Sequence, residues 1–207
     1  MVKIWYKLPQ LQPLEIKPYL RAIKNQISNT ETINQINTLE DLIACLDKGR
    51  FDEVLDQIQE MVITKEECED FIFWDKDNYT RNCIERTDEF ELLVLCWEAG
   101  QGSAIHSHDK QDCWVKVIEG KFEERVYTYN NETHEMDRVS KHQITNNEVT
   151  FMEEPSHFHQ LTNVGDQPAI SLHLYMKPIR KCQVYDNASK NLVTLPTSDF
   201  SLFGEVL

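Results

Sequence analysis

Between Thr38 and Met61 the apolar residues recur at the three-and-four spacing of an amphipathic helix, with acidic residues between them. These apolar positions form two groups and predict two helices: Leu39, Leu42, Ile43, Cys45 and Leu46, then Val54, Leu55, Ile58 and Met61. Beyond them, Thr64 and Glu67 have the spacing of a capping box, so a third, short helix should begin there and end near Phe73.

After Trp74 the pattern changes to short runs rich in β-branched and aromatic residues, which favour strands. Clusters of Gly, Asn, Asp and Pro separate these runs and predict turns. Several strands in succession without intervening helices predict a β-sandwich or a small barrel. The predicted strands are FELLVLCW (90–97), CWVKVIEG (113–120), FEERVYTY (122–129), EVTFMEE (148–154), HFHQLTN (157–163) and ISLHLYM (170–176).

The domain organisation follows from these patterns. Residues 1–37 show no clear periodicity and contain several prolines, so we expect an irregular N-terminal lead-in. Residues 38–207 are predicted to form a single domain, with a helical portion over 38–74 and a β-barrel over about 75–207. This length is sufficient to bury a core without disulfides or metals as staples.

Composition limits the classes of binding partner and the cellular compartment that we expect. The net charge is −14 and consecutive basic residues are scarce, which argues against nucleic acid as a partner. The six cysteines form no C-x-x-C pair, and a reducing compartment fits them best. No apolar stretch approaches the length of a membrane span or a secretory signal. We therefore expect a cytoplasmic, monomeric protein with no membrane partner.

Two pairs of histidines carry the candidate chemistry. His106 and His108 are one residue apart and share a face if the chain is extended, and the same holds for His157 and His159. Two neutral imidazoles held in this way are half of a transition-metal site, although a single pair is more often a surface feature. Spacing alone does not choose the third ligand, and zinc in a three-histidine hydrolytic site stays possible on ligand type.

A second polar feature lies in the strand AISLHLYM, residues 169–176. Ser171, His173 and Tyr175 fall on one face of this strand, and apolar residues occupy the other face. Such a row normally faces solvent on a half-buried sheet. In a barrel whose lumen holds a metal, it can instead form a polar ladder in which both hydroxyls bond through the imidazole.

The histidine stretches resemble the two cupin motifs. The region 100–120 matches the first motif, G-x5-H-x-H-x4-E-x6-G, except that Cys113 stands at the glutamate position. His159 and Asn163 match the H-x3-N end of the second motif, whereas His157 does not, and it is left as a neighbour of the site. Three neutral histidines would leave the ion its full charge, which favours a soft anionic ligand such as a thiolate. The resemblance implies three metal ligands: His106, His108 and His159.

Four stretches together resemble the cysteine dioxygenase family, over about Thr38 to Val193. They are YTRN (79–82), LCWEAGQGSAIHSHDKQDCWVKVIEG (95–120), HQLTNV (159–164) and AISLHLYMKPI (169–179). The resemblance implies a mainly β fold, a cupin (jelly-roll-like) β-barrel with a small N-terminal helical portion. It also implies an Fe(II) cofactor, L-cysteine and O2 as substrates, and cysteine sulfinic acid as product.

The same resemblance implies roles for individual residues. Arg81 would bind the substrate carboxylate, for which a planar bidentate donor is suited, and Tyr79 would belong to the same substrate wall. Cys113 and Tyr175 would form a thioether cross-link, and Cys182 matches a cysteine near the substrate pocket. The outer-sphere ladder would consist of Ser171, His173 and Tyr175.

Two other functions stay open. A dioxygenase of another small thiol, such as 3-mercaptopropionate, resembles the family without this arginine and this cysteine, so Arg81 and Cys113 weigh against it. A non-catalytic cupin that binds a metal would need neither the ladder nor the arginine. Among the remaining candidates, we expect three tryptophans in the core and two histidines to be simply exposed: Trp74, Trp97 and Trp114, and His134 and His142.

Overall fold

The computed structural model describes residues 35–108, 111–152 and 156–207. The predicted lead-in therefore lies outside the described residues, apart from residues 35–37. The compact unit that the described residues form is Gln35–Leu207. No helix in this part of the chain is long and apolar enough to span a membrane.

The predicted helices are present. Thr38 caps the first helix, since its side chain accepts a hydrogen bond from the backbone N–H of Asp41. The expected capping box also forms, with Thr64 N donating to Glu67 Oε2 at 2.8 Å and Glu67 N donating to Thr64 Oγ1 at 3.4 Å. It begins a short 3₁₀ helix that ends at Phe71, two residues before the predicted end, because Ile72 already has extended backbone angles. The elements are α2 (Leu39–Asp47), α3 (Phe51–Gln57) and η1 (Glu66–Phe71).

Seven strands form the larger sheet, in the order β12-β11-β1-β2-β8-β3-β6. Its centre pairs antiparallel strands along their full length, whereas β11 joins the edge in parallel with β1. The strands are β1 (Thr80–Arg86), β2 (Phe90–Trp97), β3 (Cys113–Glu119), β6 (Val149–Phe151), β8 (Ala169–Met176), β11 (Ser201–Leu202) and β12 (Glu205–Val206).

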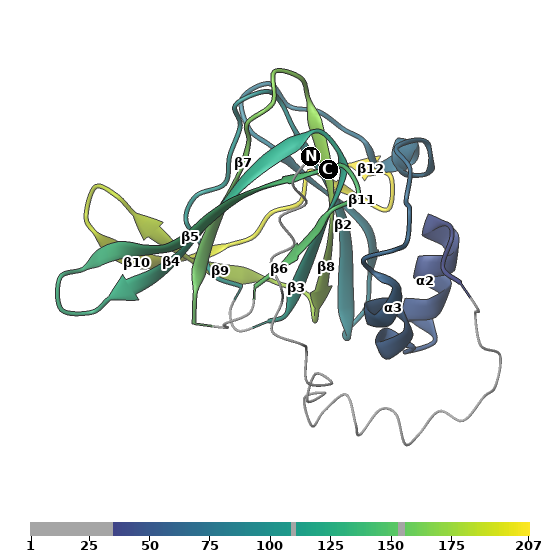
Figure 1. Cartoon of the computed structure of the whole chain (residues 1–207), viewed down its shortest axis with the longest axis horizontal. Coiled ribbons are helices and arrows are strands. Elements are labelled where there is room, and N and C mark those ends of the chain that lie inside the picture. Colours follow the sequence, from purple (N-terminus) through teal and green to yellow (C-terminus); the bar gives the residue numbers. More distant parts are fainter. Residues whose placement is uncertain (1–34, 109–110, 153–155) are drawn as a thin grey trace, which may run out of the picture. The chain divides into compact units, whose positions relative to one another are not determined.

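A smaller sheet, in the order β5-β4-β7, and a separate hairpin, β9-β10, complete the strands (Figure 1). The two hairpins β4-β5 and β9-β10 extend from the same side of the barrel (Figure 1), and Lys190 Nζ bonds Glu135 Oε1 between them at 2.6 Å. The strands are β4 (Lys121–Asn130), β5 (Glu135–Thr145), β7 (Phe158–Asn163), β9 (Lys181–Asp186) and β10 (Asn191–Pro196).

The two larger sheets enclose one apolar core. It joins Leu93 and Val117 of the seven-stranded sheet to Phe122 and Leu161 of the three-stranded one, all buried. This architecture confirms the predicted mainly β, jelly-roll-like barrel with a small helical portion. Each predicted strand is present, although the one predicted over 148–154 is limited to Val149–Phe151, with residues 153–154 outside the described residues, and β7 begins at Phe158. His157 precedes the strand, so the expectation that it shares a strand face with His159 is wrong.

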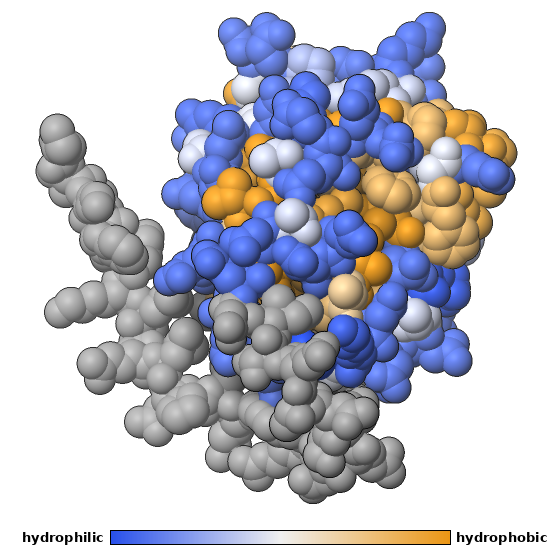
Figure 2. All heavy atoms as spheres, turned by 90° about the vertical axis from the view of Figure 1, so that its right-hand side faces the viewer, coloured by the Kyte–Doolittle hydropathy of each residue, from blue (hydrophilic) through white to orange (hydrophobic). Residues whose placement is uncertain are grey.

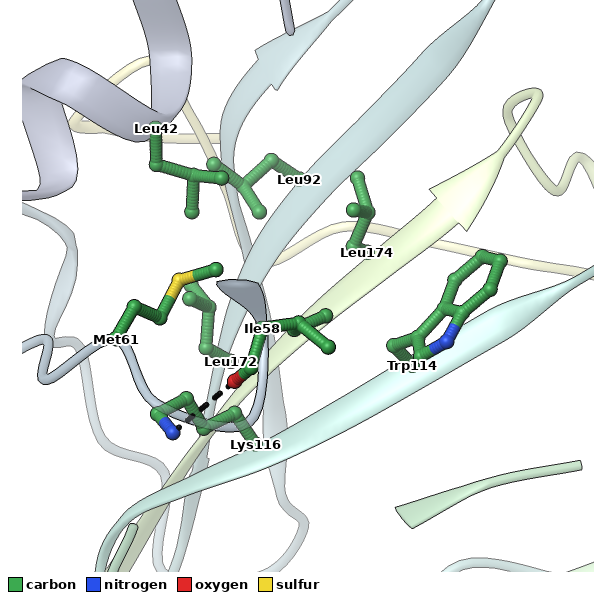
Figure 3. A pocket seen from close by; sticks show the side chains of 8 residues that line it. All are labelled: Leu42, Ile58, Met61, Leu92, Trp114, Lys116, Leu172 and Leu174. Carbon is green, nitrogen blue, oxygen red and sulfur yellow. Dashed lines mark hydrogen bonds between the residues drawn. The ribbon is translucent and has the colours of Figure 1, made fainter. Parts of the chain in front are cut away.

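The helices cover the outer face of the large sheet (Figure 1). Figure 3 shows Lys116 in this interface, where its ammonium donates hydrogen bonds to two carbonyl oxygens, of Ile58 at 3.3 Å and of Asn147 at 3.0 Å. Burial lowers the pKa of Lys116, and these bonds satisfy its polar head. Around it lie the apolar side chains of Leu42, Ile58, Met61, Leu92, Trp114, Leu172 and Leu174.

Figure 2 shows the side of the molecule that carries α2 and α3. Hydrophilic side chains cover most of it, with hydrophobic ones between them.

Of the tryptophans expected in the core, only Trp97 is fully buried, with 1 % exposed, while Trp114 is half-buried. Trp74 is 36 % exposed, which corrects the expectation of a core position for that residue.

Candidate metal centre

Three histidines from distant parts of the chain form one cluster. Their ligand nitrogens all lie within 4.8 Å of one another. His106 and His159 are brought together by backbone pairing, with each N–H donating to the other's carbonyl at 2.9 and 2.8 Å. His106 also bridges to Val184 of β9, so its extended segment is held from both sides. The predicted ligand set, His106, His108 and His159, is thus brought together, and His157 is outside the cluster.

Hydrogen bonds orient the rings. His106 Nδ1 bonds the carbonyl of Ala104 at 2.9 Å, and His159 Nδ1 bonds Glu124 Oε1 at 2.6 Å, so in both rings Nδ1 carries the proton. Their Nε2 lone pairs are then free, and His159 Nε2 lies 3.0 Å from His108 Nε2. Imidazole nitrogens this close and directed at each other suit a shared metal ion.

Burial keeps two of the three histidines, His106 and His108, neutral. Burial, aided by the neighbouring His159, lowers the pKa of His106 to about 3. The same two causes lower the pKa of His108 well below its ordinary value. Neutral imidazoles have the lone pairs that a metal requires, and the donor set of this site therefore fits a divalent transition-metal ion.

Glu124 of β4 is a site residue that the sequence analysis missed. It is 3 % exposed and accepts hydrogen bonds from His159, from Thr150 Oγ1 at 2.5 Å and from His142 Nε2 at 3.0 Å. Burial acts to raise the pKa of Glu124, but the bonds from His142, His159 and Thr150 lower it below its usual range. His142 was expected to be simply exposed; its side chain is 40 % exposed yet bonded to this carboxylate, which corrects that expectation.

The signal that identifies Glu124 is strand alternation. Phe122 is in the core, so the residue two positions later on the same strand points inward as well. Glu123 instead pairs with two partly exposed cations, Arg125 and Lys141. Of two adjacent glutamates, only the second is directed at the histidines.

The polar row of β8 is buried and hydrogen-bonded. Ser171 Oγ lies 2.9 Å from His173 Nε2, and Tyr175 OH lies 3.4 Å from His173 Nδ1. Trp97 Nε1 donates to Ser171 Oγ at 2.9 Å and so extends the row. The Tyr175 ring is 5.3 Å from the ring of His108, centroid to centroid. The row is therefore the expected ladder beside the histidine cluster, and not a solvent-facing surface.

Cys113 and Tyr175 are directly opposite each other on β3 and β8. Side chains at such positions have Cβ atoms about 4.5–5.5 Å apart. Both residues are buried, at 2 and 3 % exposed, and burial raises the pKa of each. The pair implied by the resemblance is thus adjacent in the barrel interior.

Arg81 of β1 lies on the same face of the large sheet as Tyr175, and its guanidinium carbon is 5.8 Å from the centroid of the Tyr175 ring. Its Nη2 is 3.4 Å from Glu91 Oε2, and its Nε is 3.8 Å from Asp199 Oδ1. Nε is buried and has no hydrogen-bond partner. A buried guanidinium N–H without an acceptor indicates a position for an anionic group of a ligand.

Two carboxylates hold this arginine, and the sequence analysis found neither. Glu91 is fully buried, and it also pairs with Arg86 and accepts from Ile179 N at 3.3 Å. Asp199 bonds Arg86 Nη2 at 2.7 Å. The two arginines and two carboxylates balance in charge, so Arg81 is held without an excess of negative charge beside it.

Tyr79 and Cys182 border the arginine. Tyr79 stacks on Trp97, with ring centroids 4.2 Å apart and planes 16° apart. Burial raises the pKa of Tyr79 and of Cys182, while the charge of Arg81 lowers both. Both predicted pocket residues are therefore close enough to Arg81 to be affected by its charge.

A sequence model described as cysteine dioxygenase type I matches residues 23–188. The chain belongs to this family. Cysteine dioxygenase type 1 of Danio rerio is 29 % identical over 178 residues, which cover 81 % of this chain and 89 % of that protein. Cysteine dioxygenase type 1 of Rattus norvegicus is 32 % identical over 127 residues, which cover 59 % of this chain and 64 % of the rat protein. The family supports a dioxygenase, and the resemblance found in the sequence is confirmed.

Among solved structures, this chain is similar to that of an uncharacterized conserved protein with a double-stranded beta-helix domain from Klebsiella pneumoniae. It is 16 % identical, with a TM-score of 0.44, and the match covers 62 % of this chain and 87 % of that one. The cysteine dioxygenase family match includes every predicted site residue, whereas Asp199 lies beyond it.

Proposed function

We propose that this protein is a thiol dioxygenase that converts L-cysteine and O2 to cysteine sulfinic acid at a three-histidine Fe(II) centre. One observation carries the proposal. A cluster of three histidines shares the barrel interior with Arg81, whose buried Nε–H lacks an acceptor. A substrate with a metal-binding thiolate and a carboxylate would use both features.

His106, His108 and His159 would hold the metal through Nε2. Iron in such a site, when bound, supplies Lewis acidity and one-electron chemistry toward O2. The protein contributes orientation and a dry environment, in which fixed charges act more strongly than in water. Both oxygen atoms end on the substrate sulfur, which gives the sulfinic rung of the sulfur oxidation ladder.

Arg81 would bind the substrate carboxylate through its free Nε–H and its neighbouring donors. Glu91 holds the guanidinium through Nη2, and Asp199 Oδ1 lies 3.8 Å from Nε, which is too far for a hydrogen bond. Tyr79 and Cys182 would form the wall beside the carboxylate. Ser171 and His173 fix the hydroxyl of Tyr175 through a chain of hydrogen bonds, so the phenol would be oriented before substrate arrives.

We also propose the thioether cross-link between Cys113 and Tyr175. With iron and O2 present, Tyr175 would lose one electron and its phenolic proton in an occasional uncoupled turnover, and the sulfur of Cys113 would lose its proton as it bonds the ring carbon next to the hydroxyl. Loss of a second electron and transfer of the ring proton to the phenol oxygen would restore the aromatic ring. In total two electrons and two protons leave the pair and reduce O2 to H2O2. The opposed positions of the two residues support this step.

Oxygen uptake by the iron-loaded protein tests the proposal. L-cysteine should support uptake and yield the sulfinic acid, identified by mass spectrometry, whereas cysteamine, which lacks the carboxylate, should not. Uptake with 3-mercaptopropionate alone would assign another thiol as substrate. No uptake with any thiol, despite bound iron, would leave a metal-binding cupin without activity. The monomeric state, the cytoplasmic location, and the absence of nucleic-acid and membrane partners stay predictions, as do the domain boundaries.

A further inference from the structure

None of the three proposed metal ligands is a carboxylate, but a carboxylate lies next to one of them. Cys113 occupies the motif position at which a glutamate would bind the ion. One strand away, Glu124 places a buried carboxylate oxygen 2.6 Å from Nδ1 of the ligand His159. The negative charge thus lies one imidazole ring behind the metal position.

The neighbours of Glu124 have to offset the burial of its carboxylate. An ionised carboxylate that is 3 % exposed requires positive charge or several hydrogen bonds to offset its loss of hydration. The ion pairs recorded for Glu124 in the described part of the chain are with two histidines, His142 and His159, and Thr150 adds a neutral donor. A metal ion on the far side of His159 would add positive charge to this group of side chains.

We propose that Glu124 is a positioning residue of the metal centre, an inference that rests on the metal site of the proposed function. Glu124 fixes His159 in the tautomer that has its proton on Nδ1 and directs Nε2 at the ion. Its negative charge also replaces the charge that a glutamate at the motif position would have placed near the metal. Thr150 and His142 hold the carboxylate in turn by binding its second oxygen.

Adjacent Glu123 provides a matched control. It is on the same strand and also has low exposure, at 5 %, but its carboxylate pairs with Arg125 at 2.6 Å and Lys141 at 2.8 Å. Glu123→Gln removes the same charge at the neighbouring position without touching a histidine. A difference between the two glutamine variants therefore reports the contact with His159.

The test titrates Co(II) into the metal-free full chain and follows its ligand-field absorption. Glu124→Gln keeps an acceptor for His159 but loses the charge, and it should weaken binding roughly 10- to 100-fold, the range typical of partners that orient metal ligands. Its cobalt spectrum should also shift, which a purely structural role would not produce. Glu123→Gln should match wild type in both, and Glu124→Asp should bind better than Glu124→Gln.

Equal cobalt affinity and spectra for wild type and Glu124→Gln would overturn the inference. If Glu124→Gln does not fold, Thr150→Val and His142→Gln take its place: a several-fold loss of affinity in both supports the inference, and wild-type affinity in both overturns it. Failure of the proposed function gives a different result. In that case the Glu124→Gln difference persists, but the iron-loaded wild type consumes no oxygen with cysteine.

Discussion

The two faces of strand β8 are both buried, but they carry opposite chemistry. Ser171 and His173, 0 and 4 % exposed, bond each other on the barrel side. Leu172 and Leu174, 4 and 3 % exposed, lie on the helix side against Leu42 (Figure 3). Polar–apolar alternation usually marks a strand with one wet face. Here it marks a strand between a reactive interior and an ordinary core.

The difference separates the energetic roles of the two faces. Each polar side chain on the barrel side has a hydrogen-bond partner. The hydrogen bonds offset the cost of removing these groups from water but add little to the free energy of unfolding. Each leucine on the helix side contributes about 1.5–3 kcal/mol by burial alone. Substitutions on the first face should therefore alter chemistry, and substitutions on the second should alter stability.

The largest effect should come from the ligands of the barrel side. His159→Ala removes a nitrogen donor, so iron content should fall from about one ion per chain to near zero, with no measurable oxygen uptake. Elemental analysis of the purified protein measures the metal. His157→Ala is the control and should keep its iron, because His157 lies outside the cluster. Loss of iron in His157→Ala but not in His159→Ala would reverse the assignment.

Arg81→Gln should have the next largest effect. It leaves a substrate carboxylate without its charged partner, and kcat/KM for L-cysteine should fall by the equivalent of roughly 2–5 kcal/mol. Steady-state oxygen uptake measures it. Arg125→Gln, on the surface of β4, should change little. Efficient oxidation of cysteamine by wild type, with little effect of Arg81→Gln, would exclude the role of this arginine.

On the helix side, Leu174→Ala should act on stability alone. A buried leucine shortened to alanine typically costs 2–5 kcal/mol in the free energy of unfolding, and we expect about 3 kcal/mol here. Urea denaturation measures this loss, and kcat/KM should stay within about twofold of wild type, since no catalytic contact is changed. Leu195→Ala, at a position that is 46 % exposed, is the matched control and should cost under about 0.5 kcal/mol. A loss of iron in Leu174→Ala would show that the two faces are not separable.

Cys113→Ser should have the smallest effect. The serine cannot form the thioether, so the loss of two hydrogens in intact mass and the faster-migrating band on a reducing gel should both disappear. Iron content should be unchanged and activity should fall only a few-fold, because the cross-link positions the phenol and holds no metal. A mass loss that persists in Cys113→Ser, or that never appears in wild type after many turnovers, contradicts the cross-link.

Sequence patterns predicted the barrel-side histidines and the ladder because their motifs are local. Glu124 and Glu91 were missed because an acidic residue in a strand resembles a solvent-facing one until its partner is known. Strand β1 was missed for the same reason: TRNCIER contains three charges, and Arg81 is buried only because Glu91 and Asp199 face it. The hairpin β9-β10 is mostly exposed and has no apolar face to reveal it.

The parallel pairing of β11 with β1 has a consequence for the order in which the protein is made. Phe200 N donates to the carbonyl of Arg81 at 2.7 Å, and Ser201 Oγ donates to Asn82 Oδ1 across 119 residues of sequence. At a synthesis rate of 5–20 residues per second, β11 leaves the ribosome about 6–24 s after β1. Until then Arg81 lacks Asp199 and its edge strand, so the carboxylate site should be among the last parts of the nascent chain to mature.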